Sequence, residues 1–448
     1  MEWMTVTRAP NEQLRLLLRA AGLSNSQFAR LIVAVAAEHE QNLTCDRSTV
    51  SRWLAGHQPR PPTPTFLLEA LTRRLNRPVT AQEAGLTRAP SVLPALNHSS
   101  GMDPVSRLAL LTRAELDPGS SALPRERSYS LSALSIPVAE SAGQRKKTLS
   151  SPAVRADAQV VQMGAMVTMF AEAAECHGGG SVRSALAAYL AHDVSRWLRV
   201  QAGDETSRRL HSTAAQLVLL LGAMSMDDGD HALAQHYQRI AAELAAEAAD
   251  HGMLAIALRL MATHAYELGH HGGAVLHLME RSVAAAGRAQ PITEVYARAQ
   301  LSVIKAHHDR RAALAELART ERLYDQADSS PGAFTTYPPG ALHYQRAQVF
   351  MALGDTPAAV SALNTSLRLR TPVERRASCL TRASLAETLL GAGHLDAALG
   401  HWGEFVSVYP ALCSARATRR LRVMRSRLQV HRKYPPTATL LERAKDLV

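Results

Sequence analysis

A glycine followed five residues later by an alanine recurs at near-regular intervals through the second half of the sequence. A glycine lets the chain turn out of one helix, and a small alanine lets the next helix pack closely against it. The register positions 229, 269, 308, 354 and 393 lie 40, 39, 46 and 39 residues apart. Small residues repeated at such periods predict helical hairpins stacked side by side. The pairs are Gly229 with Ala234, Gly269 with Ala274, the degenerate His308 with Ala313, Gly354 with Ala359, and Gly393 with Ala398.

The turn segments LGDTPAAVSALNTSLRL and GAGHLDAALGHWGEFV resemble those of tetratricopeptide repeats, with a period longer than the usual ~34 residues. Aromatic residues make up only 4% of the chain, which suits close-packed helices better than sheet. From about Ala153 onward nearly every segment has a helical pattern. We therefore expect an all-α protein in which residues 151–448 form a tetratricopeptide-like α-solenoid with a concave binding surface.

The segment Asp46–Gly56, DRSTVSRWLAG, is a second informative feature and is typical of one short helix. Asp46 is a favourable N-cap and Gly56 a favourable closing residue. Val50, Trp53 and Leu54 form an apolar stripe that can be buried. The opposite face would carry two arginines and two hydroxyls, a set that can contact base edges and phosphates of DNA. The alternative is an ordinary amphipathic helix with a solvated face.

The neighbouring segments favour the DNA-binding interpretation. Helices are predicted at Asn11–Ala21, from about Gln27, and at Phe66–Leu75, with three prolines excluding helix just before the last of these. The segments LLRAAGLSNSQFARL, RSTVSRWLAG and PTPTFLLEALTRRL resemble, over residues 11–86, the Cro/repressor-type (XRE-like) helix-turn-helix regulators of actinobacteria. The connection IVAVAAEHEQNLTC is much longer than the usual tight turn. It predicts an extended second helix and a loop around Gln41–Thr44.

The site residues of the expected DNA-binding domain follow from this arrangement and from the resemblance. Trp53 is expected in the core. A helix N-terminus and a nearby arginine are natural partners of a phosphate. The expected base contacts are Arg47, Ser48 and Arg52. The expected phosphate contacts are Ser26, Gln27, Ser51, His57 and Arg60.

The distribution of charge supports a nucleic-acid partner. The net charge is +11, and it separates into +4 over residues 1–90, +2 over 91–160, −3 over 161–410 and +8 over 411–448. Basic ends suit DNA, whereas the slightly acidic middle weakly favours a neutral or cationic ligand. The last basic stretch, Arg416–Lys433, is expected to be the final helix that closes the solenoid. Its arginines form either a solvated face or a face for phosphate or an acidic partner.

Other motifs give no support for catalysis, a cofactor or a metal. The three glycines of CHGGGSVRSALAAYL lack the context of a nucleotide loop and indicate a plain helix start. His264, His270, His271 and His277 crowd one hairpin without a metal-ligand spacing, and we expect them to be surface histidines. Asp227 and Asp228 are expected to be helix caps. No catalytic triad is recognisable, so we expect no enzyme.

The sequence therefore predicts three regions: a helix-turn-helix domain over 1–90, a Pro/Ser-rich linker over 91–150 with a short helix at Pro104–Glu115, and the repeat domain over 151–448. The four cysteines form no CxxC pair, and neither a signal peptide nor a membrane span is apparent, so a cytoplasmic, nucleoid-associated protein is expected. The layout is similar to that of Gram-positive quorum-sensing regulators whose repeats bind a signalling peptide.

We expect a homodimeric repressor that binds double-stranded DNA and whose repeats sense a peptide or small signal. The ligand-contacting residues are not predictable from the sequence. The alternative is a protein-interaction scaffold whose helix-turn-helix module is degenerate.

Overall fold

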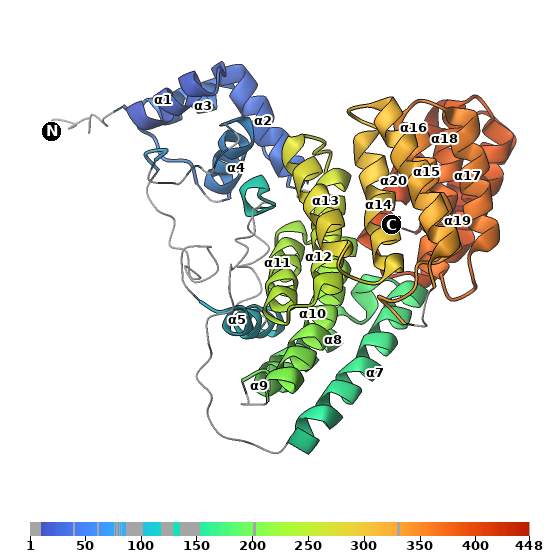
Figure 1. The fold of residues 1–448 in the computed structure, drawn as a ribbon. Coiled ribbons are helices and arrows are strands. Elements are labelled where there is room, and N and C mark those ends of the chain that lie inside the picture. The colour runs from blue at the N-terminus through green and yellow to red at the C-terminus, as the bar shows by residue number, and fades with distance from the viewer. Residues whose placement is uncertain are drawn as a thin grey trace.

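The computed structural model describes residues 10–38, 41–60, 62–75, 77, 79, 81, 83–86, 102–117, 129–134, 153–199, 203–328 and 332–447. Every regular element within these ranges is helical, which confirms the predicted all-α class. In Figure 1 the blue N-terminal helices lie on the side of the yellow-green hairpins, and the orange hairpins lie on the opposite side of the molecule. Most of the predicted linker, at 91–101, 118–128 and 135–150, lies outside the described ranges, as do the first nine residues.

Four helices form the N-terminal domain: α1 (Glu12–Ala20), α2 (Asn25–Glu38), α3 (Arg47–Leu54) and α4 (Thr63–Leu75). Ser24 and Gln27 cap α2 reciprocally, because the Ser24 Oγ accepts from the Gln27 N–H while the Gln27 side chain accepts from the Ser24 N–H. Asp46 caps α3 by accepting from the Thr49 N–H at 2.8 Å. Gly56 ends that helix with a φ of +94°.

The core of this domain is formed by apolar stripes from all four helices. Val50 and Trp53 of α3 are buried in it, as their spacing predicts. The long α2 and the irregular segment at 41–46 match the predicted lengthened connection. One boundary differs from the prediction: α4 begins at Thr63 rather than Phe66, because Pro64 is tolerated in a first helical turn.

Five helical hairpins follow one another in described residues 203–408. They are α10 (Asp204–Asp227) with α11 (His231–Glu247), α12 (His251–Glu267) with α13 (Gly273–Ala286), α14 (Pro291–Lys305) with α15 (Arg310–Gln326), α16 (Pro339–Ala352) with α17 (Thr356–Leu369), and α18 (Arg375–Gly391) with α19 (Leu395–Val408). This stack confirms the predicted tetratricopeptide-like repeat.

The register residues behave largely as predicted. Gly229, Gly269, Gly354 and Gly393 all have φ between +75° and +86°, a backbone conformation that favours glycine. The degenerate turn at His308 uses no left-handed residue, and its following helix is instead capped by Asp309. Ala274 is exposed rather than packed, because α13 begins at Gly273 and buries Val275 in its place.

Parts of the segment predicted as linker pack into the repeat body. Helix α5 (Pro104–Leu116) matches the short helix predicted there and contacts α11 and α8 (Arg183–Tyr189). Leu108 and Tyr129 are fully buried in the same core as the first two hairpins. The short helix η2 (Leu131–Leu134) lies between α4 and α12 and α13. Residues 129–134, called the strap below, therefore connect the N-terminal domain with the repeats.

The first helix of the repeat body meets its last hairpin. Helix α7 (Ala153–His177) packs against both α10 and α18, as Figure 1 shows in green beside the hairpins. The turns η3 (Gly179–Ser181) and η4 (Leu190–Val194) and helix α9 (Ser195–Trp197) complete this end. At the other end lie η5 (Tyr409–Ala411), α20 (Ala415–Leu428), η6 (Gln429–His431) and α21 (Pro435–Arg443). The basic α20 is therefore not the final helix, since α21 follows it and packs on α19 and α20.

Candidate functional site

The eight residues predicted to contact DNA all lie on the surface of the N-terminal domain. The first turn of α2 lies beside α3, because Asn25 Nδ2 donates to Ser51 Oγ at 3.1 Å. The beginning of α2 and the polar face of α3 therefore form one continuous surface. The exposed residues are Ser26, Gln27, Arg47, Ser48, Ser51, Arg52, His57 and Arg60.

Several of these side chains already make local hydrogen bonds. The Gln27 amide oxygen accepts from Ser24, which leaves its NH₂ group to donate outward. Ser48 Oγ donates its proton to Asp46, so it could donate to a base edge only if that hydrogen bond were exchanged. Hydrogen bonds from Thr49 and Ser48 lower the pKa of Asp46 to about 2, which keeps this N-cap ionised at neutral pH. Arg47 and Arg52 are the exposed cations of the face.

A second candidate site is a cavity of about 480 Å³ inside the repeats. The first helix of each hairpin lines it, together with α7 and the segment that precedes α16. Its walls are mainly apolar. The apolar lining includes Leu220, Met224, Ile256, Leu260, Tyr296 and Phe334.

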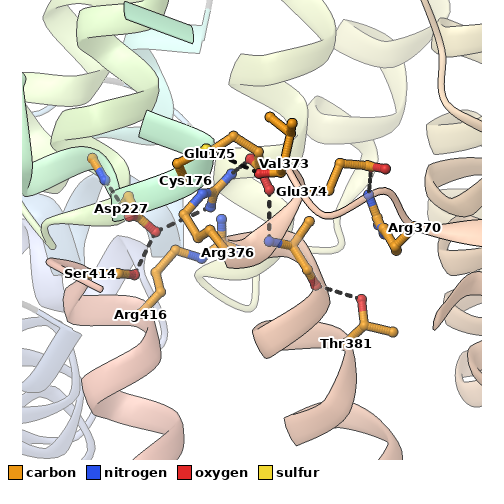
Figure 2. Close-up of polar contacts among 12 residues, drawn as sticks. Glu175, Cys176, Asp227, Arg370, Val373, Glu374, Arg376, Thr381, Ser414 and Arg416 are labelled. Atoms are coloured by element: carbon orange, nitrogen blue, oxygen red, sulfur yellow. Dashed lines mark hydrogen bonds and ion pairs between the residues drawn. The ribbon is translucent and has the colours of Figure 1, made fainter. Parts of the chain in front are cut away.

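A charged junction closes one side of this cavity, where α7, α10, α18 and α20 meet (Figure 2). Arg376 Nη2 lies 3.0 Å from a Glu175 carboxylate oxygen, and its Nη1 lies 3.3 Å from Asp227 Oδ1. Glu175 also accepts from the Ala377 N–H at 2.7 Å. Ser414 Oγ donates to Asp227 at 2.9 Å. These bonds join residues between 149 and 202 positions apart and hold the two ends of the repeat body together.

Asp228 is the C-cap residue of α10, as predicted, whereas Asp227 is the last residue of the helix itself. Both lie at the end of α10, where Asp227 accepts from Arg376, Ser414 and the Gly179 N–H. Asp228 instead pairs with the buried Arg183 of α8 at 2.7 Å. The Asp227 side chain neutralises the partly exposed Arg376 and the Asp228 side chain neutralises the buried Arg183, which a local sequence pattern does not reveal.

The three glycines, Gly178 to Gly180, lie where two backbone segments approach each other closely. Their role therefore goes beyond beginning a helix. Gly178 has a φ of +88°, and a Cβ there would lie 2.4 Å from the Cys413 carbonyl oxygen. A Cβ on Gly179 would lie 2.8 Å from the Cα of Met224. The backbones also pair, since the Gly180 N–H donates to Cys413 O at 3.0 Å. The glycines thus let the start of the repeat body pack directly on its end.

A more polar hollow of about 470 Å³ lies next to the cavity, and both are lined by Glu267 and Arg416. These two side chains pair at 2.7 Å. Arg419 and Arg420 of α20 line the polar hollow, so part of the basic helix faces the inside of the repeat body. Leu421, Met424 and Leu428 are buried, as their spacing predicts.

The expectation of surface histidines is wrong for His264, which is fully buried on α12. Its Nε2 lies 3.0 Å from His231 Nδ1, and its ring packs edge-on against Tyr129. Tyr129 also stacks on His270, whose pKa burial lowers to about 4. His271 stacks on His307 at a ring distance of 4.2 Å. Among the described residues, no group of three or more His, Cys, Asp or Glu is placed to hold a metal ion.

The cavity was not predictable because its lining comes from at least five separated helices with no shared motif. The only indication in the sequence was the repeat itself, which implies a concave face.

Within the described residues, no helix combines the length and apolar character needed to cross a bilayer.

Comparison with known proteins gives one family match and several structural likenesses. Residues 14–87, which span most of α1 and all of α2 to α4, match the family described as the SP15 N-terminal domain. No curated protein matches the chain. The crystal structure of a Rap protein complexed with competence and sporulation factor is similar with a TM-score of 0.43 and 12% identity, covering 66% of this chain and 87% of that one. The Cut9–Hcn1 hetero-tetramer of the APC/C is similar with a TM-score of 0.33 and 14% identity, covering 90% of this chain and 68% of that one.

Proposed function

We propose that this chain is a DNA-binding transcriptional regulator whose repeat domain binds a small signalling ligand or peptide and forms a homodimer. The observation that carries the proposal is the polar face of α3. Its buried Val50 and Trp53 fix the helix on the domain, and its exposed face carries Arg47 and Arg52 on either side of Ser51, which bonds to the first turn of α2. Exposed arginines on a rigid helix can donate two hydrogen bonds to guanine in the major groove. Repression would follow from occupation of the promoter.

The strap links the repeat domain to the N-terminal domain, so a change of conformation at the cavity could be transmitted through it to the DNA-binding domain. Arg73 of α4 pairs with Glu38 and Glu69, and Glu69 accepts from the Leu131 N–H at 3.2 Å. On the repeat side, the Ser130 N–H donates to the Gln235 side chain at 2.9 Å. The strap thus bonds to both bodies.

Helix α12 connects the strap with the cavity. Its residues Ile256, Leu260 and Thr263 line the cavity, while His264 packs against Tyr129 of the strap. A ligand that binds more tightly to one position of α12 would also favour one position of the strap. A ligand shifts the regulator between two states only if its affinity for the two differs. Coupling of 1–3 kcal/mol is typical of allosteric proteins and changes affinity roughly 5- to 150-fold.

The test of DNA binding is selection from random duplexes, followed by competition between the selected and a scrambled duplex at fixed salt. Arg52→Ala should lower discrimination between them by about 1–3 kcal/mol, because a bidentate base contact is lost. Arg60→Ala should weaken both duplexes alike, since a phosphate contact carries no sequence information. Arg443→Ala, on the distant α21, serves as the control for charge alone.

The second candidate is a protein-interaction scaffold, which the long connection between α2 and α3 favours because it departs from a tight helix-turn-helix. Failure to select any duplex with the folded full chain would refute the regulator and leave the scaffold.

A further inference from the structure

The polar hollow beside the cavity is lined by three arginines from one helix. Arg416, Arg419 and Arg420 all border it, and their spacing of three and four residues places them on one side of α20. The volume of the polar hollow, about 470 Å³, lies within the range of small-molecule sites. A single helix therefore presents three guanidinium groups to one space of suitable size for a ligand.

Helix α20 is fixed on the repeat body, so its arginines are held at the polar hollow. Its apolar stripe is anchored in the core, where Leu421 and Met424 are fully buried. At its start, Ser414 caps the helix by accepting from the Ala417 N–H. The same hydroxyl donates to Asp227 at 2.9 Å, which ties the start of α20 to the charged junction (Figure 2).

The charges around the polar hollow are unbalanced. Glu267 is the one acidic side chain among its described lining residues, and it pairs with Arg416 at 2.7 Å. Arg420 pairs at 2.6 Å with Glu387, which lies outside the lining. Arg419 is exposed and makes no ion pair within the described part of the chain. Since a guanidinium carries five N–H donors, one carboxylate partner also leaves donors of the other two arginines for a ligand.

Aromatic rings form another part of the lining. His271 and His307 stack with their ring centroids 4.2 Å apart, and the Tyr266 hydroxyl lies 3.1 Å from His307 Nε2. Partial burial, and then neighbouring histidines, lowers the pKa of both imidazoles, so they are neutral at pH 7. Tyr344 and Gln348 of α16 add two further polar side chains. The positive charge of the polar hollow therefore comes from the arginines, while the other polar groups can hydrogen-bond without adding charge.

Three guanidinium groups at one small hollow favour a ligand with several anionic oxygens. The planar guanidinium donates hydrogen bonds in pairs to phosphate oxygens, and such charge-assisted bonds are roughly twice as strong as neutral ones. A single carboxylate has two oxygens and can accept from one guanidinium in this paired manner. A phosphate group has more acceptors and more charge, so it can engage several guanidiniums together. Duplex DNA is too wide to enter a hollow of this volume.

We propose that the polar hollow binds a small phosphorylated molecule whose phosphate oxygens accept hydrogen bonds from Arg416, Arg419 and Arg420. For these three arginines, the proposal selects a phosphate partner over a solvated face. Bound phosphate would compete with Glu267 for Arg416, whose pair borders both the polar hollow and the cavity. The inference goes beyond the proposed function, because it requires neither DNA binding nor a ligand in the cavity.

The test is isothermal titration calorimetry of the full chain with inorganic pyrophosphate at constant ionic strength. Arg419→Gln should weaken binding at least about tenfold, because it removes charge-assisted hydrogen bonds to the ligand. Arg425→Gln is the matched control, since it removes the same charge from the same helix. Arg425 is not among the residues that line the polar hollow, and the helical repeat places it roughly half a turn around α20 from Arg416.

Two further variants distinguish a phosphate site from a general attraction by charge. Glu267→Gln removes the carboxylate that competes for Arg416, so pyrophosphate should bind several-fold more tightly. Arg420→Lys keeps the charge but loses the planar fork, so it should weaken binding, whereas Arg425→Lys should not. Arg419→Gln should leave the urea midpoint of unfolding unchanged, because the Arg419 side chain is exposed. A scrambled duplex at equal phosphate concentration should not displace pyrophosphate.

Four results would overturn the proposal. One is the absence of pyrophosphate binding by the wild-type chain, and another is an equal loss of affinity in Arg419→Gln and Arg425→Gln. The third is weaker binding in Glu267→Gln. The fourth is displacement of pyrophosphate by the scrambled duplex, which would mean that the arginines hold DNA phosphates. Base discrimination by Arg52 is measured separately, so failure of this proposal and failure of the DNA proposal are distinguishable.

Discussion

Arg376→Met should be the most damaging single substitution at the junction that closes the repeat body. It removes the cation that lies between Glu175 and Asp227, at 3.0 and 3.3 Å, while keeping a side chain of similar length. At an effective dielectric constant of about 20, each pair has a gross attraction of roughly 5 kcal/mol. Most of that attraction offsets the desolvation of the charges.

The net loss of unfolding free energy depends on Glu175 and Asp227, the two carboxylates that lose their cation. Removing one partner of a buried ion pair costs about 3–5 kcal/mol. Asp227 is 4% exposed, but the Arg376 and Glu175 side chains are each 24% exposed, so water can partly solvate the site after the change. We therefore expect the lower end of that range, about 3 kcal/mol. Asp227 keeps its bonds from Gly179 and Ser414, which limits the loss further.

The assay is urea unfolding of the full chain followed by circular dichroism, with hydrogen exchange measured at residues 174–180 and 413–418. Arg382→Met is the matched control on the same helix, because Arg382 pairs with Glu404, which is 57% exposed. A surface pair contributes about 0–1 kcal/mol. If the two variants lose equal stability, or if exchange at the junction does not rise in Arg376→Met, the junction does not hold the ends together.

Two further substitutions test the backbone packing and the buried histidine. Gly178→Ala should lower the free energy of unfolding in urea by more than about 2 kcal/mol, since it adds a clash with Cys413 to the strain of a left-handed alanine. Gly164→Ala, in open space within α7, should instead raise it by about 0.5–1 kcal/mol. The pKa of His270 is lowered from 6.5 to about 4 by burial and then by Arg73 and His271. Unfolding therefore takes up a proton between those values, and stability should fall as the pH is lowered through that window. His270→Gln should flatten this decline in unfolding midpoints measured across the window, and the exposed His277→Gln should not; equal slopes in both variants would contradict the assignment.

The repeat fold could be predicted because its signal is local and recurs. Each turn glycine needs a left-handed conformation, and each following helix needs a small residue, so the same pair appears wherever a hairpin turns. Gly229, Gly354 and Gly393 all follow this rule. The rule failed at Ala274, because α13 begins four residues after Gly269 whereas the other glycine turns lead into a helix after two, and Val275 is buried in place of Ala274.

The N-terminal elements were predictable for a similar reason. Asp46 as an N-cap and Gly56 as a closing residue act within one helical turn of α3, and the Val50 and Trp53 spacing identifies its buried face. The exposed face follows directly from the buried one. What these residues bind is a separate matter, and it stays a prediction.

The sequence alone determined the helical class, the hairpin turns and which face of each helix is polar, because these depend on residues within a few positions of one another. The tertiary structure alone decided which charges meet. Asp227 and Arg376 lie 149 positions apart, and only the curvature of five stacked hairpins brings them together. The same curvature places His307 and Arg419 around one hollow. Small rotations between successive hairpins accumulate along the stack, and no local pattern of residues encodes their sum.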